Sequence, residues 1–125
     1  MSTHRVDYKE LVEKITSLKV YPIVIPQKAT YPCIEMTIFG GGRDDDSNIS
    51  NANIRGYRIS LTICSKLAST NAKYETMLIN SLDGKPNITN GTKSLVMYYA
   101  NTVEIYNYAQ SLHEMTVEFT TKKLN

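Results

Sequence analysis

Two short segments alternate apolar and polar residues, and this period of two constrains the fold more than any other feature of the chain. In CIEMTIF, residues 33–39, Ile34, Met36 and Ile38 share one side, and RGYRISLTICS, residues 55–65, repeats the pattern. Such alternation is typical of strands with one buried face. The sequence therefore predicts a hairpin of two half-buried strands, joined by a long polar loop, whose apolar face other elements must cover.

Two other segments have the spacing of amphipathic helices. In VDYKELVEKITSL, residues 6–18, apolar residues recur every three or four positions with charges opposite them. STNAKYETMLINSLDG, residues 69–84, repeats apolar residues at every fourth position, with Thr70 or Asn71 expected as N-cap and Gly84 as the stop. We expect both segments to be helices that pack on the sheet.

The remaining segments complete the predicted order of elements. VYPIVIPQKATYP, residues 20–32, predicts an extended crossing segment because its prolines disfavour helix, and KPNITNGT, residues 85–92, is typical of a turn. Residues 94–108 and 112–123 are rich in β-branched and aromatic side chains, which predicts the last strands. The predicted fold class is α+β: one domain, residues 1–125, with a small, mainly antiparallel sheet and two α-helices packed on one face.

The stretch FGGGRDDDSN predicts a flexible acidic loop over residues 40–54, between the two hairpin strands. It lacks the motifs of a phosphate-binding loop. Asp44, Asp46 and Asn48 match the first ligand positions of a calcium loop, but Ile49 and Arg55 replace its required glycine and glutamate. A solvated acidic loop and a loose surface cation site both remain open.

No constellation for catalysis is evident. His113 and Glu114 begin like a zinc-protease motif, but Val117 stands where its second histidine is needed. Cys33 and Cys64 lack CxxC spacing and lie among apolar residues, so we expect buried thiols. We therefore predict a protein that is not an enzyme, with no cofactor and no metal.

Charge and hydropathy leave the partner open. The 125-residue chain has a formal net charge of +2, and its N-terminus lacks the apolar core of a signal peptide. We expect a soluble protein made in the cytoplasm, with no membrane partner. Tyr98, Tyr99, Tyr106 and Tyr108 are accompanied by Glu104 and amides instead of basic residues, which favours packing on the core or at a protein interface over base stacking.

The order of segments across nearly the whole chain resembles the lambda-type tail-terminator, or tail-completion, proteins of long-tailed bacteriophages. The resemblance is carried by LVEKITSL, by VYPIVIPQKATYPCIEM leading into a strand, by RGYRISLTICS, by NAKYETMLINSLDG and by the closing HEMTVEFTTK. It implies an α/β subunit that forms a ring, typically a hexamer, on the head-proximal end of the tail tube. Such a ring stops tube polymerisation and offers the interface for head joining, with no cofactor or covalent chemistry.

The resemblance also implies partners and a location. The partners are further copies of the chain, the tail tube protein and the connector or neck protein of the head, while DNA passes through the ring without specific binding. The location is the virion, after assembly in the host cytoplasm. The acidic loop would face the bore or a partner, through Arg43, Asp44, Asp45, Asp46 and Asn48.

Two alternatives remain open at the level of the sequence. A phage neck or head-completion protein has a similar size. A generic α/β binding module could contact nucleic acid through the tyrosines and the C-terminal Lys122 and Lys123.

Overall fold

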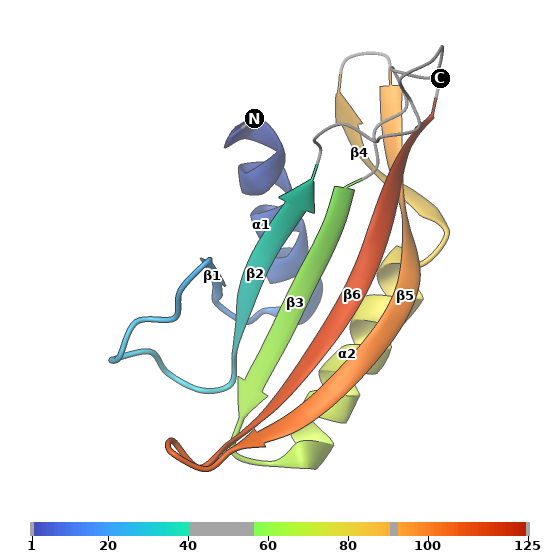
Figure 1. Cartoon of the computed structure of the whole chain (residues 1–125). Coiled ribbons are helices and arrows are strands. Elements are labelled where there is room, and N and C mark those ends of the chain that lie inside the picture. Colours follow the sequence, from blue (N-terminus) through green and yellow to red (C-terminus); the bar gives the residue numbers. More distant parts are fainter. Residues whose placement is uncertain (1, 41–56, 91–92, 125) are drawn as a thin grey trace.

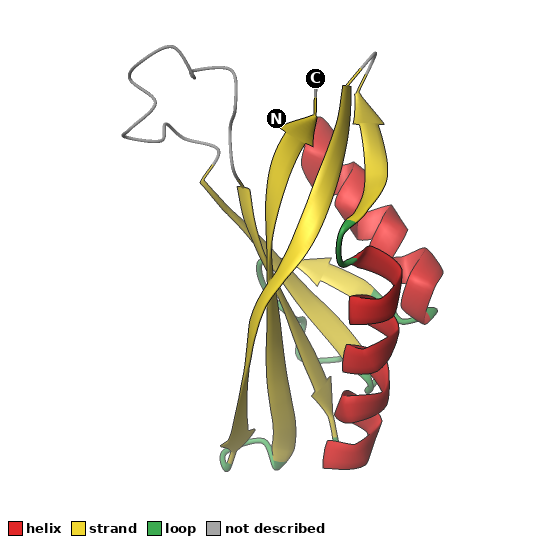
Figure 2. Ribbon diagram, turned by 90° about the vertical axis from the view of Figure 1, so that its right-hand side faces the viewer, coloured by secondary structure: helices red, strands yellow, loops and turns green. Residues whose placement is uncertain are grey.

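The computed structural model describes residues 2–40, 57–90 and 93–124, whose helices and strands form two layers, a sheet and a pair of helices (Figure 1). The elements are α1 (Ser2–Thr16), β1 (Val20–Pro22), β2 (Cys33–Gly40), β3 (Tyr57–Ser65), α2 (Ala68–Leu82), β4 (Lys85–Asn90), β5 (Lys93–Asn107) and β6 (Leu112–Leu124). Both helices lie on the same side of the sheet (Figure 2). The predicted α+β class is therefore confirmed.

The strands form one sheet in the order β1-β2-β3-β6-β5-β4. All neighbours are antiparallel except β1, the one strand of the predicted crossing segment, which runs parallel to β2. β2 and β3 pair from Cys33 opposite Cys64 to Gly40 opposite Tyr57, which confirms the predicted hairpin. β5 and β6 pair along most of their length, and the turn that joins them lies beyond the end of β3 (Figure 1).

The core lies between the sheet and the two helices. The predicted alternation is confirmed, because Ile34 and Met36 of β2 are at most 1% exposed and belong to the same buried cluster as the apolar residues of β3 and β6. The helices contribute Tyr8 and Val12 from α1 and Leu78 from α2. The other fully buried members from the sheet and α2 are Val20, Ile59, Leu61, Ile63, Leu82, Met97, Val117 and Phe119.

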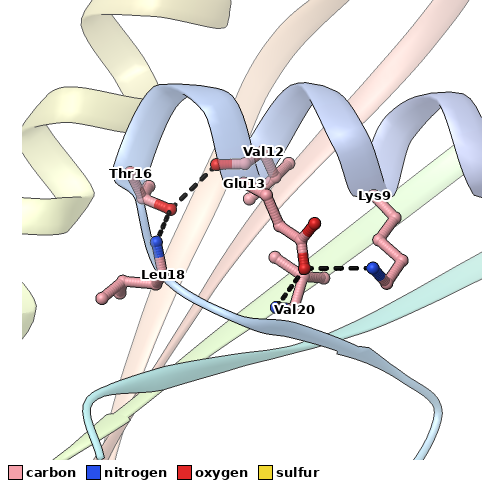
Figure 3. A network of polar contacts seen from close by, with 6 residues as sticks. All are labelled: Lys9, Val12, Glu13, Thr16, Leu18 and Val20. Carbon is pink, nitrogen blue, oxygen red and sulfur yellow. Dashed lines mark hydrogen bonds and ion pairs between the residues drawn. The ribbon is translucent and has the colours of Figure 1, made fainter.

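Polar contacts fix the junction between α1 and β1 (Figure 3). The Glu13 carboxylate accepts hydrogen bonds from the backbone N–H of Val20, at 2.9 Å, and from Lys9 Nζ, at 3.0 Å. Thr16 Oγ1 donates to the carbonyl of Val12 and accepts from the N–H of Leu18. The helix ends at Thr16, two residues before the predicted end, and these bonds hold the first residue of β1 against the last turn of α1.

The start of α2 differs from the prediction. The N-cap residue is Leu67, and Asn71 lies inside the helix with 1% of its surface exposed. Its Oδ1 accepts from the Ser65 hydroxyl at 2.7 Å, and its Nδ2 donates to the carbonyl of His113 at 3.0 Å. The N-cap prediction was wrong because Asn71 bridges α2 to β3 and β6. The expected stop is confirmed, since α2 ends at Leu82 and Gly84 has a φ of +72°.

The predicted turn over residues 85–92 is largely a strand. Residues 85–90 form β4, which pairs antiparallel with the first residues of β5, from Lys85 opposite Met97 to Asn90 opposite Lys93. Pro86 is tolerated because β4 is the last strand of the sheet order and its register shifts between Pro86 and Ile88. The predicted chain reversal therefore holds, but it is confined to the link between β4 and β5.

Candidate interaction surface

The predicted acidic-loop residues lie outside the described part of the chain. These are Arg43, Asp44, Asp45, Asp46 and Asn48. What the structure gives is the point of attachment, because Gly40 at the end of β2 pairs with Tyr57 at the start of β3. The loop therefore leaves and re-enters the sheet at adjacent backbone positions.

The first two candidate tyrosines point to opposite faces of β5. Tyr98 lies opposite Thr120 and is 42% exposed, whereas Tyr99 lies opposite the buried Phe119, with their ring centroids 6.0 Å apart. The Tyr99 hydroxyl lies 2.6 Å from Thr102 Oγ1. Tyr99 is thus held on the helix side of the sheet by Phe119 and Thr102. Tyr98 lies on the opposite side, where its ring is exposed to a partner.

The other two candidate tyrosines lie together at the turn between β5 and β6. The ring centroid of Tyr106 lies 4.8 Å from that of Tyr108 and 4.8 Å from that of His113, each edge to face. Tyr108 is 85% exposed, the most of any large apolar side chain described. Asn107 shapes the turn by accepting from the N–H of Gln110. The structure thus brings together two of the four tyrosines, and the four do not form one platform for stacked bases.

A larger surface, which the sequence interpretation missed, is the side of the sheet opposite the helices, here called the outer face. Its side chains alternate with those of the core along β2, β3, β6 and β5. No described helix lies on it (Figures 1 and 2). Its exposed apolar side chains are Phe39, Tyr98, Val103 and Ile105. The signal was present in the sequence, since Val103 and Ile105 alternate with polar residues in a strand from which the sequence analysis singled out only the tyrosines.

Hydroxyls and carboxylates occupy the middle of the outer face. Ser60 Oγ donates to the Glu118 carboxylate at 3.2 Å, and the hydroxyls of Thr62 and Thr116 lie 2.9 Å apart. Burial, and after it the negative charge of Glu114, raises the pKa of Glu35. The outer face therefore carries acidic groups and hydroxyls between its apolar side chains.

Cys33 and Cys64 lie opposite each other at one end of the outer face, and both are buried free thiols, as predicted. The pKa of Cys33 is raised to about 11, mainly by burial and to a smaller extent by the negative charge of Glu35. The pKa of Cys64 is raised to about 12, mainly by burial and next by the negative charge of Glu114. A thiol with so high a pKa holds almost no thiolate at neutral pH and is a poor nucleophile.

The described residues contain neither a cluster of metal ligands nor a membrane-spanning helix. Within residues 2–40, 57–90 and 93–124, no three His, Cys, Asp or Glu side chains are grouped closely enough to hold a metal ion. In the same ranges, neither helix combines the length and the hydropathy of a membrane span. His113, which the sequence suggested for a failed zinc motif, packs its ring against Tyr106.

Comparison with protein-family models and with curated proteins found no significant match to this chain.

Proposed function

We propose that this protein is a structural virion protein of a long-tailed bacteriophage, which caps the head-proximal end of the tail tube as a ring. In this role it stops tube polymerisation and provides the interface to which the head joins. The order of elements supports the proposal, because the helix, crossing segment, hairpin, helix and closing strands follow the order expected of a tail terminator.

The observation that carries the proposal is the exposure of apolar side chains on the outer face and at the β5–β6 turn. Val103 is 50% exposed, Ile105 is 59% exposed and Tyr108 is 85% exposed. Apolar and aromatic side chains gathered in this way mark surfaces that contact other proteins. A ring subunit needs two different surfaces of this kind, since heterologous contacts must close head to tail.

The acidic loop has a role in the same proposal. Asp44, Asp45 and Asp46 would face the bore or a basic partner. Carboxylates in a bore discourage tight phosphate contacts, which would otherwise slow the passage of DNA.

Binding to tail tubes tests this function. The purified chain is mixed with preformed tubes of the tail protein from the same phage, and the pellet after centrifugation is quantified. We expect saturation at about one ring for each tube, at one of its two ends, because heterologous contacts close into a ring. Binding along the tube walls, or no binding at all, would count against the proposal. Steeply salt-dependent binding to single-stranded DNA without tube binding would favour the nucleic-acid module instead.

A further inference from the structure

The two edges of the sheet differ in their capacity to accept another strand. An exposed edge offers unpaired backbone N–H and C=O groups, and native proteins usually block such edges with proline, lysine, short strands or covering segments. The edge formed by β1 is blocked in this way, and part of the edge formed by β5 is not.

At the β1 edge, neither of the two residues that point away from β2 offers a free backbone N–H. The carbonyl of Lys19 and the N–H of Ile23 bond to β2, so the alternate residues point outward. The N–H of Val20 donates to Glu13 (Figure 3). Pro22 has no N–H, and its carbonyl accepts from Val24 at 2.8 Å. The three-residue β1 strand therefore resists further pairing along its own length.

At the other edge, β4 covers only the first part of β5. Pairing with β4 stops at Met97, and just beyond it the N–H of Tyr99 donates to Asp83 Oδ1, at 2.8 Å. Among the described residues, the stretch 101–107 of β5 pairs with β6 alone. This stretch, here called the open edge, contains neither proline nor lysine. Its β-branched and aromatic residues favour an extended backbone.

The two faces of the open edge have different chemistry. Val103 and Ile105 lie on the outer face, opposite Thr116 and Glu114 of β6. Thr102 and Glu104 lie on the helix side, where Thr102 Oγ1 donates to the Glu75 carboxylate of α2 at 2.7 Å. A strand added here would therefore place one face against aliphatic side chains and the other beside two carboxylates.

A second copy of the same edge is a poor occupant. Glu104 is the middle residue of the open edge, so a two-fold antiparallel pairing over residues 101–107 places the two Glu104 side chains directly opposite each other. Like charges in that position destabilise a strand pair. β1, on the other side of the sheet, offers no free N–H for such pairing. Self-pairing through the backbone is therefore disfavoured at the open edge and at β1.

We propose that the open edge is a docking site for an extended strand of a different protein, with apolar residues on one face and lysine or arginine on the other. The backbone of that strand would extend the sheet beyond β5. Its apolar side chains would lie beside Val103 and Ile105, and its cations beside Glu104 and Glu75. This inference holds whether or not the protein caps a tail tube.

The probe is a capped synthetic peptide of about eight residues, near the usual length of a strand, that alternates valine and lysine. Binding is followed by NMR titration and amide hydrogen exchange of the intact chain. We expect protection of alternate amides within residues 101–107. We expect affinity to fall about tenfold or more when glutamate replaces the lysines, because the new charges oppose Glu104. A peptide with proline in place of its central valines should not bind.

Two variants and one measurement complete the test. Glu104→Lys should reverse the preference so that the glutamate peptide binds better. Glu10→Lys makes the same charge change on the exposed face of α1 and should leave both affinities unchanged. The peptide comparison on the unaltered chain is decisive even if a variant fails to fold. Absence of protection within residues 101–107 would overturn the proposal. Protection that rises with protein concentration alone would also overturn it, in favour of a second copy.

Discussion

Replacing Asn71 tests whether this side chain bridges three elements or caps a helix. Asn71→Ala removes two buried hydrogen bonds, one with Ser65 and one with the carbonyl of His113. Each is worth about 1 kcal/mol, and the void adds about 1 kcal/mol. The higher helix propensity of alanine returns about 0.6 kcal/mol. The free energy of unfolding should therefore fall by about 2 kcal/mol, which at this chain length lowers Tm by roughly 8 °C.

Urea denaturation measures this change in the free energy of unfolding. Replacement of Asn71 by serine distinguishes a bridging role from a capping role. Serine is as good an N-cap as asparagine, so a capping residue would tolerate Asn71→Ser without loss. In the bridge, the shorter serine side chain does not reach the His113 carbonyl, and Asn71→Ser should cost nearly as much as alanine. Thr70→Ala is the matched control and should change stability by less than about 0.5 kcal/mol. A fully stable Asn71→Ser variant would refute the bridge.

Two further predictions concern ionisable groups. Partial burial of Glu13 opposes ionisation, but the hydrogen bonds from Val20 and Lys9 outweigh it and lower the pKa of Glu13. Because the folded pKa lies below the unfolded one, this carboxylate stabilises the fold above about pH 4.3, and the contribution disappears as the pH falls through the folded value. Glu13→Gln should therefore cost about 1 kcal/mol at pH 7, allowing for partial exposure, and less once the pH falls below the folded pKa. A cost independent of pH would contradict the assignment. Cys33 and Cys64 should react with an aromatic disulfide reagent at pH 7 more than about a hundredfold slower in the native protein than in denaturant, because burial raises both pKa values. Rapid labelling of the native protein would show that the thiols are accessible.

The elements with a strong side-chain period were predictable from the sequence. The alternation of Ile34 and Met36, and of Met115, Val117 and Phe119, identifies the face that the helices cover. These patterns are local consequences of burying one side of a strand, so no knowledge of neighbouring segments is needed.

Other features depend on tertiary contacts that cannot be predicted from the local sequence. Asn71 near a helix start has the signature of a cap, and only the positions of Ser65 and His113 make it a buried bridge. The turn-like composition of residues 85–92 conceals β4, which forms because it pairs with β5. Propensity is a weak guide where a neighbouring strand supplies the hydrogen bonds.

The candidate site was only partly predictable for a related reason. Composition predicted an interface role for Tyr98, Tyr99, Tyr106 and Tyr108, but the two consecutive tyrosines necessarily point to opposite faces of β5. The open edge was missed entirely. Whether a strand lacks a second neighbour depends on the strand order and on where β4 ends. The sequence of β5 alone determines neither of these.

Tube growth tests the central claim most directly. Purified tail tube protein is allowed to polymerise with increasing amounts of this chain, and tube lengths are measured by electron microscopy. A terminator occupies the surface that the next tube subunit needs, so the mean length should fall steadily and capped tubes should carry a ring at one end. Tube lengths that are unchanged at a saturating concentration of the chain, with no ring at either end, would contradict the account.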